Sequence, residues 1–163
     1  MILITAVDKN WGIGKDNQLL YSLPDDMAFF RKQTLGKTVL MGRKTLESFK
    51  NSKPLPNRQN IVLTNKQLLS QYENLSYINS IDEININNDS IILIGGASLY
   101  KQFYNKCTYA FITKIKEDKV IPDVYFPNLD EDKNWEIVEV IEQATSTNGI
   151  DYEILLYKNK KEV

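Results

Sequence analysis

The sequence predicts an α/β fold with a mixed, mostly parallel central sheet, helices on both faces and a C-terminal antiparallel hairpin. Short apolar, β-branched segments alternate with helical segments, a pattern typical of parallel strands joined by helices. The last two predicted strands follow each other with no helix between them, which indicates an antiparallel edge. The length of 163 residues corresponds to one domain, residues 1–163.

Local patterns define each element. Apolar and β-branched runs predict strands at residues 1–7, 38–42, 60–64, 75–78, 90–94, 109–115, 135–142 and 152–158. Helical spacing predicts helices at residues 25–35, 43–49 and 97–104. Residues 8–24 are rich in Gly and Asn and are expected to form a long loop, and such loops are usually functional. Ligands bind at the carboxyl ends of strands in such sheets, which directs attention to the loops after Val7, Gly42, Thr64, Ile94 and Thr113.

The composition excludes several kinds of chemistry. The chain has no histidine, which removes Ser-His-Asp and Cys-His nucleophile systems and histidine-based metal sites. The single cysteine, Cys107, allows no internal disulfide and favours a cytoplasmic location. A net charge of −1 argues against nucleic-acid binding through bulk positive charge. No stretch approaches the length of a membrane span, and we expect neither a membrane partner nor a signal peptide.

Two consecutive carboxylates open the helix predicted at 25–35. Asp25 suits the helix start, where the dipole and free N–H groups favour a capping carboxylate. Asp26 shares a helix face with Phe30, beside Met27, and a carboxylate on an apolar face needs a partner. Burial would also raise its pKa. The alternative is a second first-turn aspartate facing water, and spacing alone leaves both interpretations open.

Glycines and basic residues mark two candidate phosphate sites. Gly95-Gly96 lies between a predicted strand and a helix, where a backbone can approach a ligand closely, although a plain tight turn fits equally well. The segment Gly42–Thr45, GRKT, combines a helix start with two cations and a hydroxyl, although a solvated helix start is the simpler interpretation. Gly12 and Gly14 begin a dinucleotide fingerprint that lacks its third glycine.

One further basic residue is a candidate ligand contact. Arg58 follows the proline-rich turn KPLPN, which would hold its guanidinium rigidly. Such a group can grip a carboxylate with two parallel hydrogen bonds. A surface arginine without a ligand is the commoner case.

Taken together, these segments resemble dihydrofolate reductases over essentially the whole chain. The matching motifs occur in the family's order and at compatible spacing: the first strand ending at Ala6, the loop with Ile13-Gly14 and Asn17, LPDDMAFFR, TVLMGRKTLES, PLPNRQNIVLT, ILIGGASLY, FITKI with Thr113, and DVYFP. Each motif is weak alone, but eight in order are highly specific. The resemblance implies that dihydrofolate is reduced by hydride transfer from NADPH to C6, with protonation at N5.

The resemblance also implies the residues of the site. The implied catalytic residues are Asp26, Thr113, Tyr21 and Leu19. The implied substrate-binding residues are Ile4, Thr5, Ala6, Asp26, Met27, Phe30, Phe49, Leu55, Arg58, Ile94 and Tyr100. The implied NADPH-binding residues are Ala6, Ile13, Gly14, Asn17, Gly42, Arg43, Lys44, Thr45, Leu63, Thr64, Asn65, Ile94, Gly95, Gly96, Ala97, Ser98, Leu99 and Tyr100. Residues 38–88 are expected to form an approximate adenosine-binding subdomain.

The family's residue roles apply where the motifs match. Asp26 resembles the carboxylate that binds the pteridine 2-amino and N3 groups, and Thr113 the threonine that hydrogen-bonds it. Arg58 resembles the residue that grips the α-carboxylate of the glutamate tail. The Gly-Gly peptide is cis in the family, and residues 12–20 resemble a mobile lid. Two basic residues beside the adenosine pocket imply NADPH rather than NADH.

The chain departs from the family at a few positions. Leu20-Tyr21 replaces the usual Pro-Trp, whose tryptophan orders a water near the substrate, and a tyrosine hydroxyl can substitute for it. Ser98 replaces a frequent Arg, and Val124 replaces a common Thr. The alternatives are the related NADPH reductase of riboflavin synthesis and a non-catalytic folate- or nucleotide-binding protein on the same fold. Family precedent makes a monomer the expected state.

Overall fold

The computed structural model describes residues 1–161 of the chain, and ten strands, three α-helices and three short 3-10 helices lie within that range. The strands are β1 Ile2–Val7, β2 Gly12–Gly14, β3 Thr38–Gly42, β4 Gln59–Leu63, β5 Leu75–Ile78, β6 Ile91–Gly95, β7 Tyr109–Ile115, β8 Val124–Tyr125, β9 Trp135–Thr145 and β10 Asp151–Asn159. The helices are α1 Pro24–Thr34, α2 Arg43–Ser48 and α3 Ala97–Phe103. The 3-10 helices are η1 Lys50–Ser52, η2 Ile81–Glu83 and η3 Tyr104–Lys106.

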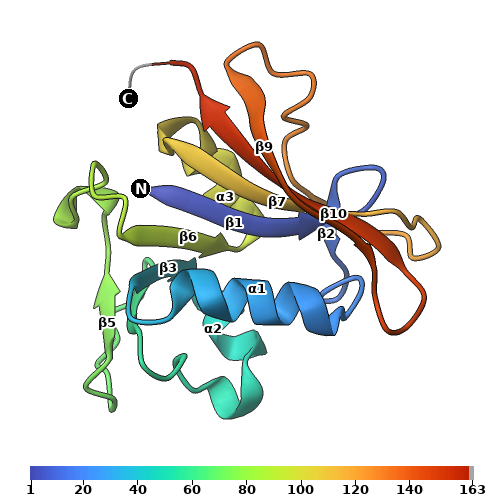
Figure 1. Cartoon of the computed structure of the whole chain (residues 1–163). Helices are drawn as coiled ribbons and strands as arrows, with labels where there is room; N and C mark the ends of the chain where they lie inside the picture. Colours follow the sequence, from blue (N-terminus) through green and yellow to red (C-terminus); the bar gives the residue numbers. More distant parts are fainter. Residues whose placement is uncertain (162–163) are drawn as a thin grey trace.

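Eight of these strands form one sheet in the order β5-β4-β3-β6-β1-β7-β10-β9 (Figure 1). The pairs from β5 to β7 are parallel, and β10 runs antiparallel to both β7 and β9. The predicted mixed, mostly parallel sheet with a C-terminal antiparallel hairpin is therefore confirmed. Strand β1 lies between β6 and β7, so the carboxyl ends of three parallel strands meet at the centre of the sheet.

Helices cover both faces of the sheet because residues alternate along β1 and β6. On one face, the buried Ile2, Ile4 and Ile92 pack against Phe29 and Phe30 of α1. On the other face, a larger core cluster joins Leu3 and Leu93 to apolar residues of α3. Figure 1 shows α1 in front of the sheet and α3 behind it. The expected three-layer arrangement is thus present.

The first loop contains structure that the sequence pattern did not predict. Within residues 8–24, β2 pairs antiparallel with β8, which is a two-stranded sheet outside the main one. Helix α1 begins at Pro24, one residue earlier than predicted, because proline fits the first position of a helix. Asp25 lies in the first turn but does not cap the helix, since the described chain has Leu23 at the N-cap and no capping side chain there.

Other boundaries shift by one to three residues. Phe49 and Tyr104 lie beyond the ends of α2 and α3, and β4 begins and ends one residue earlier than predicted. Strand β6 spans Ile91–Gly95 rather than 90–94. Strand β9 continues to Thr145 because β10 pairs with it along its whole length. No helix within residues 1–161 has the length and apolar character needed to cross a membrane.

Candidate active site

The site lies where the central parallel strands end. Ala6 on β1 is in register with Thr113 on β7, and Met41 on β3 with Gly95 on β6. A register shift between Leu40 and Met41 precedes this second pair. The sheet topology therefore gathers residues from four separate sequence motifs at one edge, which is the usual ligand position in such sheets.

Asp26 is the carboxylate of this site, and it has a partner. The Thr113 hydroxyl donates a hydrogen bond to Asp26 Oδ1 at 2.6 Å, which joins the first turn of α1 to the centre of β7. Thr113 itself is fully buried. Burial raises the pKa of Asp26, and the Thr113 hydrogen bond lowers it in part, so that the pKa stays above its ordinary value. The inward-facing interpretation of Asp26 is the one that the structure supports.

A small pocket opens beside Asp26 between β1, the end of β7 and residues 12–20, which we call the lid segment. Its lining residues are Ala6, Val7, Asp8, Gly12, Ile13, Leu19, Leu20, Tyr21, Asp26 and Ile115. Leu19 and Met27 are 61% and 48% exposed, so apolar surface faces solvent on both sides of Asp26. Exposed apolar side chains beside a buried carboxylate are suited to a flat ligand with a polar edge.

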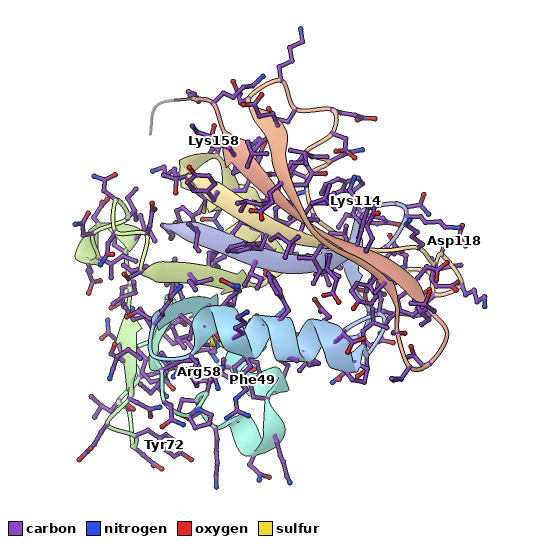
Figure 2. All side chains as sticks on the ribbon, viewed as in Figure 1. Phe49, Arg58, Tyr72, Lys114, Asp118 and Lys158 are labelled. Atoms are coloured by element: carbon purple, nitrogen blue, oxygen red, sulfur yellow. The ribbon has the colours of Figure 1, made fainter. Side chains whose placement is uncertain are left out.

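An apolar wall continues from this pocket along α1 and α2. Ile94 at the end of β6 packs in the same cluster as Phe30, and also in a cluster with Phe49 and Leu55. Phe49 lies between α1 and α2, on the same side of the molecule as Arg58 (Figure 2). Four predicted substrate contacts therefore belong to two apolar clusters that share Ile94.

Arg58 is held by the protein at the far end of this wall. It is 8% exposed, its Nε donates to the Pro56 carbonyl at 2.9 Å, and its Nη1 donates to the Thr34 hydroxyl at 3.0 Å. Burial, and then the positive charge of Arg31, lower the pKa of Arg58. Two neighbouring cations at a partly desolvated position favour an anionic ligand.

The remaining three predicted substrate contacts, Ile4 and Thr5 on β1 and Tyr100 on α3, are tied to the sheet. The Tyr100 hydroxyl donates to the Ile4 carbonyl at 2.7 Å, and both residues are buried. Burial raises the pKa of Tyr100, which keeps its proton on the hydroxyl. Thr5 is half-buried and in register with Ile112. These residues form the floor of the site rather than its open wall.

The Gly-Gly peptide and the start of α2 meet on the other side of β6. The Gly95–Gly96 bond is cis, as the resemblance implies. A Cβ atom at Gly96 would lie 3.2 Å from Thr45 Oγ1, and one at Gly42 would lie 3.4 Å from Leu99 Cδ1. The absence of side chains thus lets Thr45 and Leu99 pack close to these glycines, beside the free N–H groups that open α2 and α3.

We call the surface formed by Gly42, Thr45 and the Gly95–Gly96 peptide the cradle. The basic residues beside it already contact other protein groups. Arg43 Nη1 pairs with Glu47 Oε1 one helical turn along α2, which orients the guanidinium. Lys44 is exposed, and its carbonyl accepts a hydrogen bond at 3.2 Å from the Asn17 side-chain amide of the lid segment. The lid is therefore in direct contact with the start of α2.

The other predicted cofactor residues follow β4 and open α3. Leu63 ends β4, and the Thr64 hydroxyl accepts a hydrogen bond from the Lys66 amide at 3.2 Å. Asn65, the next residue, is exposed. Ser98 on α3 is also exposed, and its hydroxyl accepts a hydrogen bond from the side-chain amide of Gln102 at 2.9 Å. Ala97, the first residue of α3, is half-buried. These groups extend from the cradle along the sheet edge towards β4.

The lid segment is fastened to the loop between β7 and β8, residues 116–123. The Asp123 amide donates to the Gly14 carbonyl at 3.0 Å, and the Asp16 amide donates to Asp123 Oδ2 at 2.9 Å. The Tyr21 hydroxyl accepts a hydrogen bond from the Val120 amide at 3.0 Å. Tyr21 therefore lines the pocket, while its hydroxyl is hydrogen-bonded to a protein group outside the pocket.

Three residues of the site were not predicted. Arg31 supplies the second positive charge beside Arg58. It lies three residues before Thr34, the hydrogen-bond partner of Arg58, and this helical spacing could have indicated that Arg31 is near Arg58. Asp8 is 3% exposed, and in the part of the chain that the structure describes its Oδ2 has no hydrogen-bond partner. The sequence signal for Asp8 was a charged residue directly after a buried strand. The role of Val120 depends on a backbone amide, which no side-chain pattern reveals.

Comparisons with known proteins agree with this geometry. The family model described as dihydrofolate reductase matches residues 1–159. A dihydrofolate reductase of Bacillus subtilis is 40% identical over 96% of this chain and 93% of the relative, and one of Haemophilus influenzae is 39% identical over 97% and 98%. The structure of a dihydrofolate reductase from Enterococcus faecalis complexed with NADP(H) and RAB-propyl has a TM-score of 0.84 and 30% identity, covering 98% of this chain and 96% of that chain.

Proposed function

Because this chain belongs to the dihydrofolate reductase family, we propose that the pocket beside Asp26 is where it reduces 7,8-dihydrofolate to tetrahydrofolate with NADPH. The observation that carries this assignment is the Thr113–Asp26 hydrogen bond at the carboxyl ends of the central strands. One partnered carboxylate is sufficient in a chain without histidine, because the hydride comes from the cofactor.

Asp26 is proposed to bind the 2-amino and N3 groups of the pteridine. One of its oxygens accepts from Thr113, and a carboxylate has further acceptor capacity for a two-pronged contact with a ligand. Its negative charge would favour protonation of the bound pterin, which assists addition of a proton at N5. Leu19, Met27 and Phe30 would enclose the ring and exclude water from this charge.

Arg58 is proposed to hold the α-carboxylate of the glutamate tail. Its Nε and Nη1 are used by the protein, which fixes the plane of the guanidinium and leaves further N–H donors for an anion. Arg31 adds positive charge beside it. The apolar residues Phe49, Leu55 and Ile94, which share one cluster, would contact the aromatic linker between the two polar ends of the substrate.

NADPH is proposed to lie along the cradle formed by Gly42, Thr45 and the Gly95–Gly96 peptide. A Cβ atom at Gly96 would make a tight contact of 3.2 Å with Thr45 Oγ1, and glycine at this position keeps the backbone groups uncovered for a phosphate. Arg43, Lys44, Thr64 and Asn65 would hold the 2′-phosphate and adenosine. When bound, NADPH supplies the hydride, and Ile13, Gly14 and Asn17 of the lid cover that side of the site.

The wider properties of the chain are part of the same proposal. Residues 38–88, which carry β3, α2, β4 and β5, would serve as the adenosine-binding part of the single domain. We propose a cytoplasmic location because the chain has a single thiol, Cys107, which is buried and has a pKa raised by burial to about 12. We propose a monomer on family precedent, without membrane partners, and no nucleic-acid partner because the net charge is −1.

The decisive experiment follows NADPH absorbance with and without dihydrofolate. We expect NADPH to be consumed only when dihydrofolate is present and tetrahydrofolate to accumulate in equal amount. A lack of dihydrofolate-dependent oxidation, together with intact binding of NADPH and folate, would instead indicate a non-catalytic binding protein. Oxidation that depends on a phosphoribosyl substrate would indicate the riboflavin-type reductase, which the family comparisons do not favour.

A further inference from the structure

Tyr21 stands at the junction of the lid segment and α1. It follows the lid directly and precedes Leu23, the N-cap of the helix. Its half-buried ring packs against a cluster that contains Leu23, Ile115 and Tyr152, and the residue also lines the pocket beside Asp26. One side chain therefore contacts both the reaction pocket and the core beneath it.

The hydroxyl of Tyr21 reaches a distant part of the chain. It accepts a hydrogen bond at 3.0 Å from the amide of Val120, 99 residues away in the β7–β8 loop. The same loop holds the first half of the lid, through Asp123 and the pairing of β2 with β8. Tyr21 fastens the other end of the lid, so the loop contacts the lid before and after its exposed tip.

We infer that Tyr21 is a positioning residue, which holds the lid over the pocket by fastening it to the β7–β8 loop through the Val120 amide. The inference rests on the proposed function, since it concerns how that site is closed. It assigns the phenol oxygen a structural partner in the protein rather than a water molecule beside the substrate. A ring without a hydroxyl would fill the same space but leave the Val120 amide unpaired.

The size of the effect follows from the strength of one hydrogen bond. A neutral hydrogen bond of ordinary net strength changes an equilibrium by about fivefold. Loss of the Tyr21–Val120 bond should therefore shift the balance between fastened and released lid by about that factor. Ligands that need the fastened lid then bind with an apparent affinity reduced by at most the same factor.

The test compares Tyr21→Phe with the matched control Tyr72→Phe, which removes the hydroxyl of a tyrosine that is 40% exposed and lines neither the pocket nor the lid segment (Figure 2). In ligand-free protein, we expect the Val120 amide to exchange its hydrogen about fivefold faster in Y21F and at the parental rate in Y72F. In kinetics, the KM for dihydrofolate and NADPH should rise in Y21F by at most about fivefold, and by less the more fully the lid is fastened in the parent. Unchanged exchange and unchanged KM in Y21F would overturn the inference.

The pH dependence separates this role from water ordering. If the Tyr21 hydroxyl ordered a water that delivers the proton to N5, turnover of Y21F would fall increasingly below the parent as pH rises. A fastening role predicts instead that the ratio of the two turnover rates stays constant with pH. A pH-dependent ratio with unchanged Val120 exchange would therefore contradict the inference.

A second variant tests the bond from its other side. Val120→Pro removes the donor amide without altering Tyr21. If the two groups act through one bond, Y21F/V120P should be no worse than the poorer single variant, whereas multiplied losses would overturn the inference. Amide exchange in Y21F needs no catalysis, so it decides the fastening role even if the parent protein shows no dihydrofolate-dependent activity.

Discussion

At the scale of single residues, Asp26 carries the most specific prediction. Asp26→Asn retains the shape and the contact with Thr113 but removes the negative charge that favours a protonated pterin. We expect turnover near neutral pH to fall by about 10²-fold or more, with partial recovery in acid, where solvent protonates the substrate. The pH profile of dihydrofolate reduction measures this effect.

The neighbouring carboxylate supplies the control for that measurement. Asp25 lies in the same first turn but outside the lining of the pocket. Asp25→Asn should change turnover by less than about twofold, because it removes a charge without touching the reacting groups. Parental activity of D26N at neutral pH would show that Asp26 does not have this role.

The cofactor's phosphate provides a second residue-scale prediction. Replacing Arg43 or Lys44 by Ala should raise the KM for NADPH by about tenfold and leave the KM for NADH nearly unchanged, because only NADPH carries the 2′-phosphate. Lys158→Ala, on β10, is the matched control for loss of a surface charge. Equal weakening of both cofactors would mean that Arg43 and Lys44 do not contact this phosphate.

Residues could be proposed for the site from sequence where a side chain itself carries the signal. Asp26, Thr113 and Arg58 are charged or polar groups at distinctive positions, and each lies in the site with the partners described above. The partner of Tyr21 was not predictable, because its donor is the backbone amide of Val120 and no residue type marks a backbone contact. The Arg43–Glu47 pair follows helical spacing and was predictable in principle.

At the scale of elements, β2 and β8 show what sequence patterns miss. Strands of three and two residues are too short for a period of two to be recognised, and they form only because the chain brings them together. The buried strands β3 and β6 were predicted well, since continuous apolar runs between turn signals are characteristic of parallel sheets. Strand β9 is longer than predicted because its length is set by pairing with β10.

The β2–β8 pairing also gives a prediction at this scale. A Cβ atom at Gly12 would lie 2.4 Å from Pro122 Cγ and 2.7 Å from Pro122 Cβ, so Gly12→Ala must separate the lid from the β7–β8 loop. We expect a loss of about 1–3 kcal/mol in the free energy of unfolding and a higher KM for both ligands. Denaturant unfolding and steady-state kinetics measure the two effects.

A compensating substitution identifies the cause. Pro122→Gly removes the two atoms that the new methyl group would meet most closely and leaves only Asp8 Oδ2, at 3.0 Å. G12A/P122G should therefore regain a substantial part of the stability and affinity that G12A loses. If the double variant behaves as the sum of two independent losses, the clash between Gly12 and Pro122 is not the reason for the effect.

At the scale of the whole molecule, stability and activity oppose each other at Asp26. Burial raises the pKa of Asp26 above its value in the unfolded chain. The folded protein then binds this proton more tightly, so the free energy of unfolding falls as pH rises from the unfolded pKa through the folded pKa. At neutral pH, ionised Asp26 therefore destabilises the ligand-free protein, and D26N should be more stable than the parent.

This stability difference has a definite pH window and a definite response to ligand. We expect D26N to unfold at a higher temperature than the parent at neutral pH, where each 1 kcal/mol of added stability corresponds to about 2–4 °C in a chain of this size. The advantage should vanish below about pH 3, where Asp26 is protonated in both states. A folate analogue present in excess should reverse the order, because a ligand stabilises the form that binds it and the parent binds the pterin more tightly. Thermal unfolding of D26N, D25N and the parent across pH, with and without the analogue, measures all of these differences. A ligand-free D26N that unfolds below the parent at neutral pH would show that the charge of Asp26 is compensated within the protein rather than by the substrate.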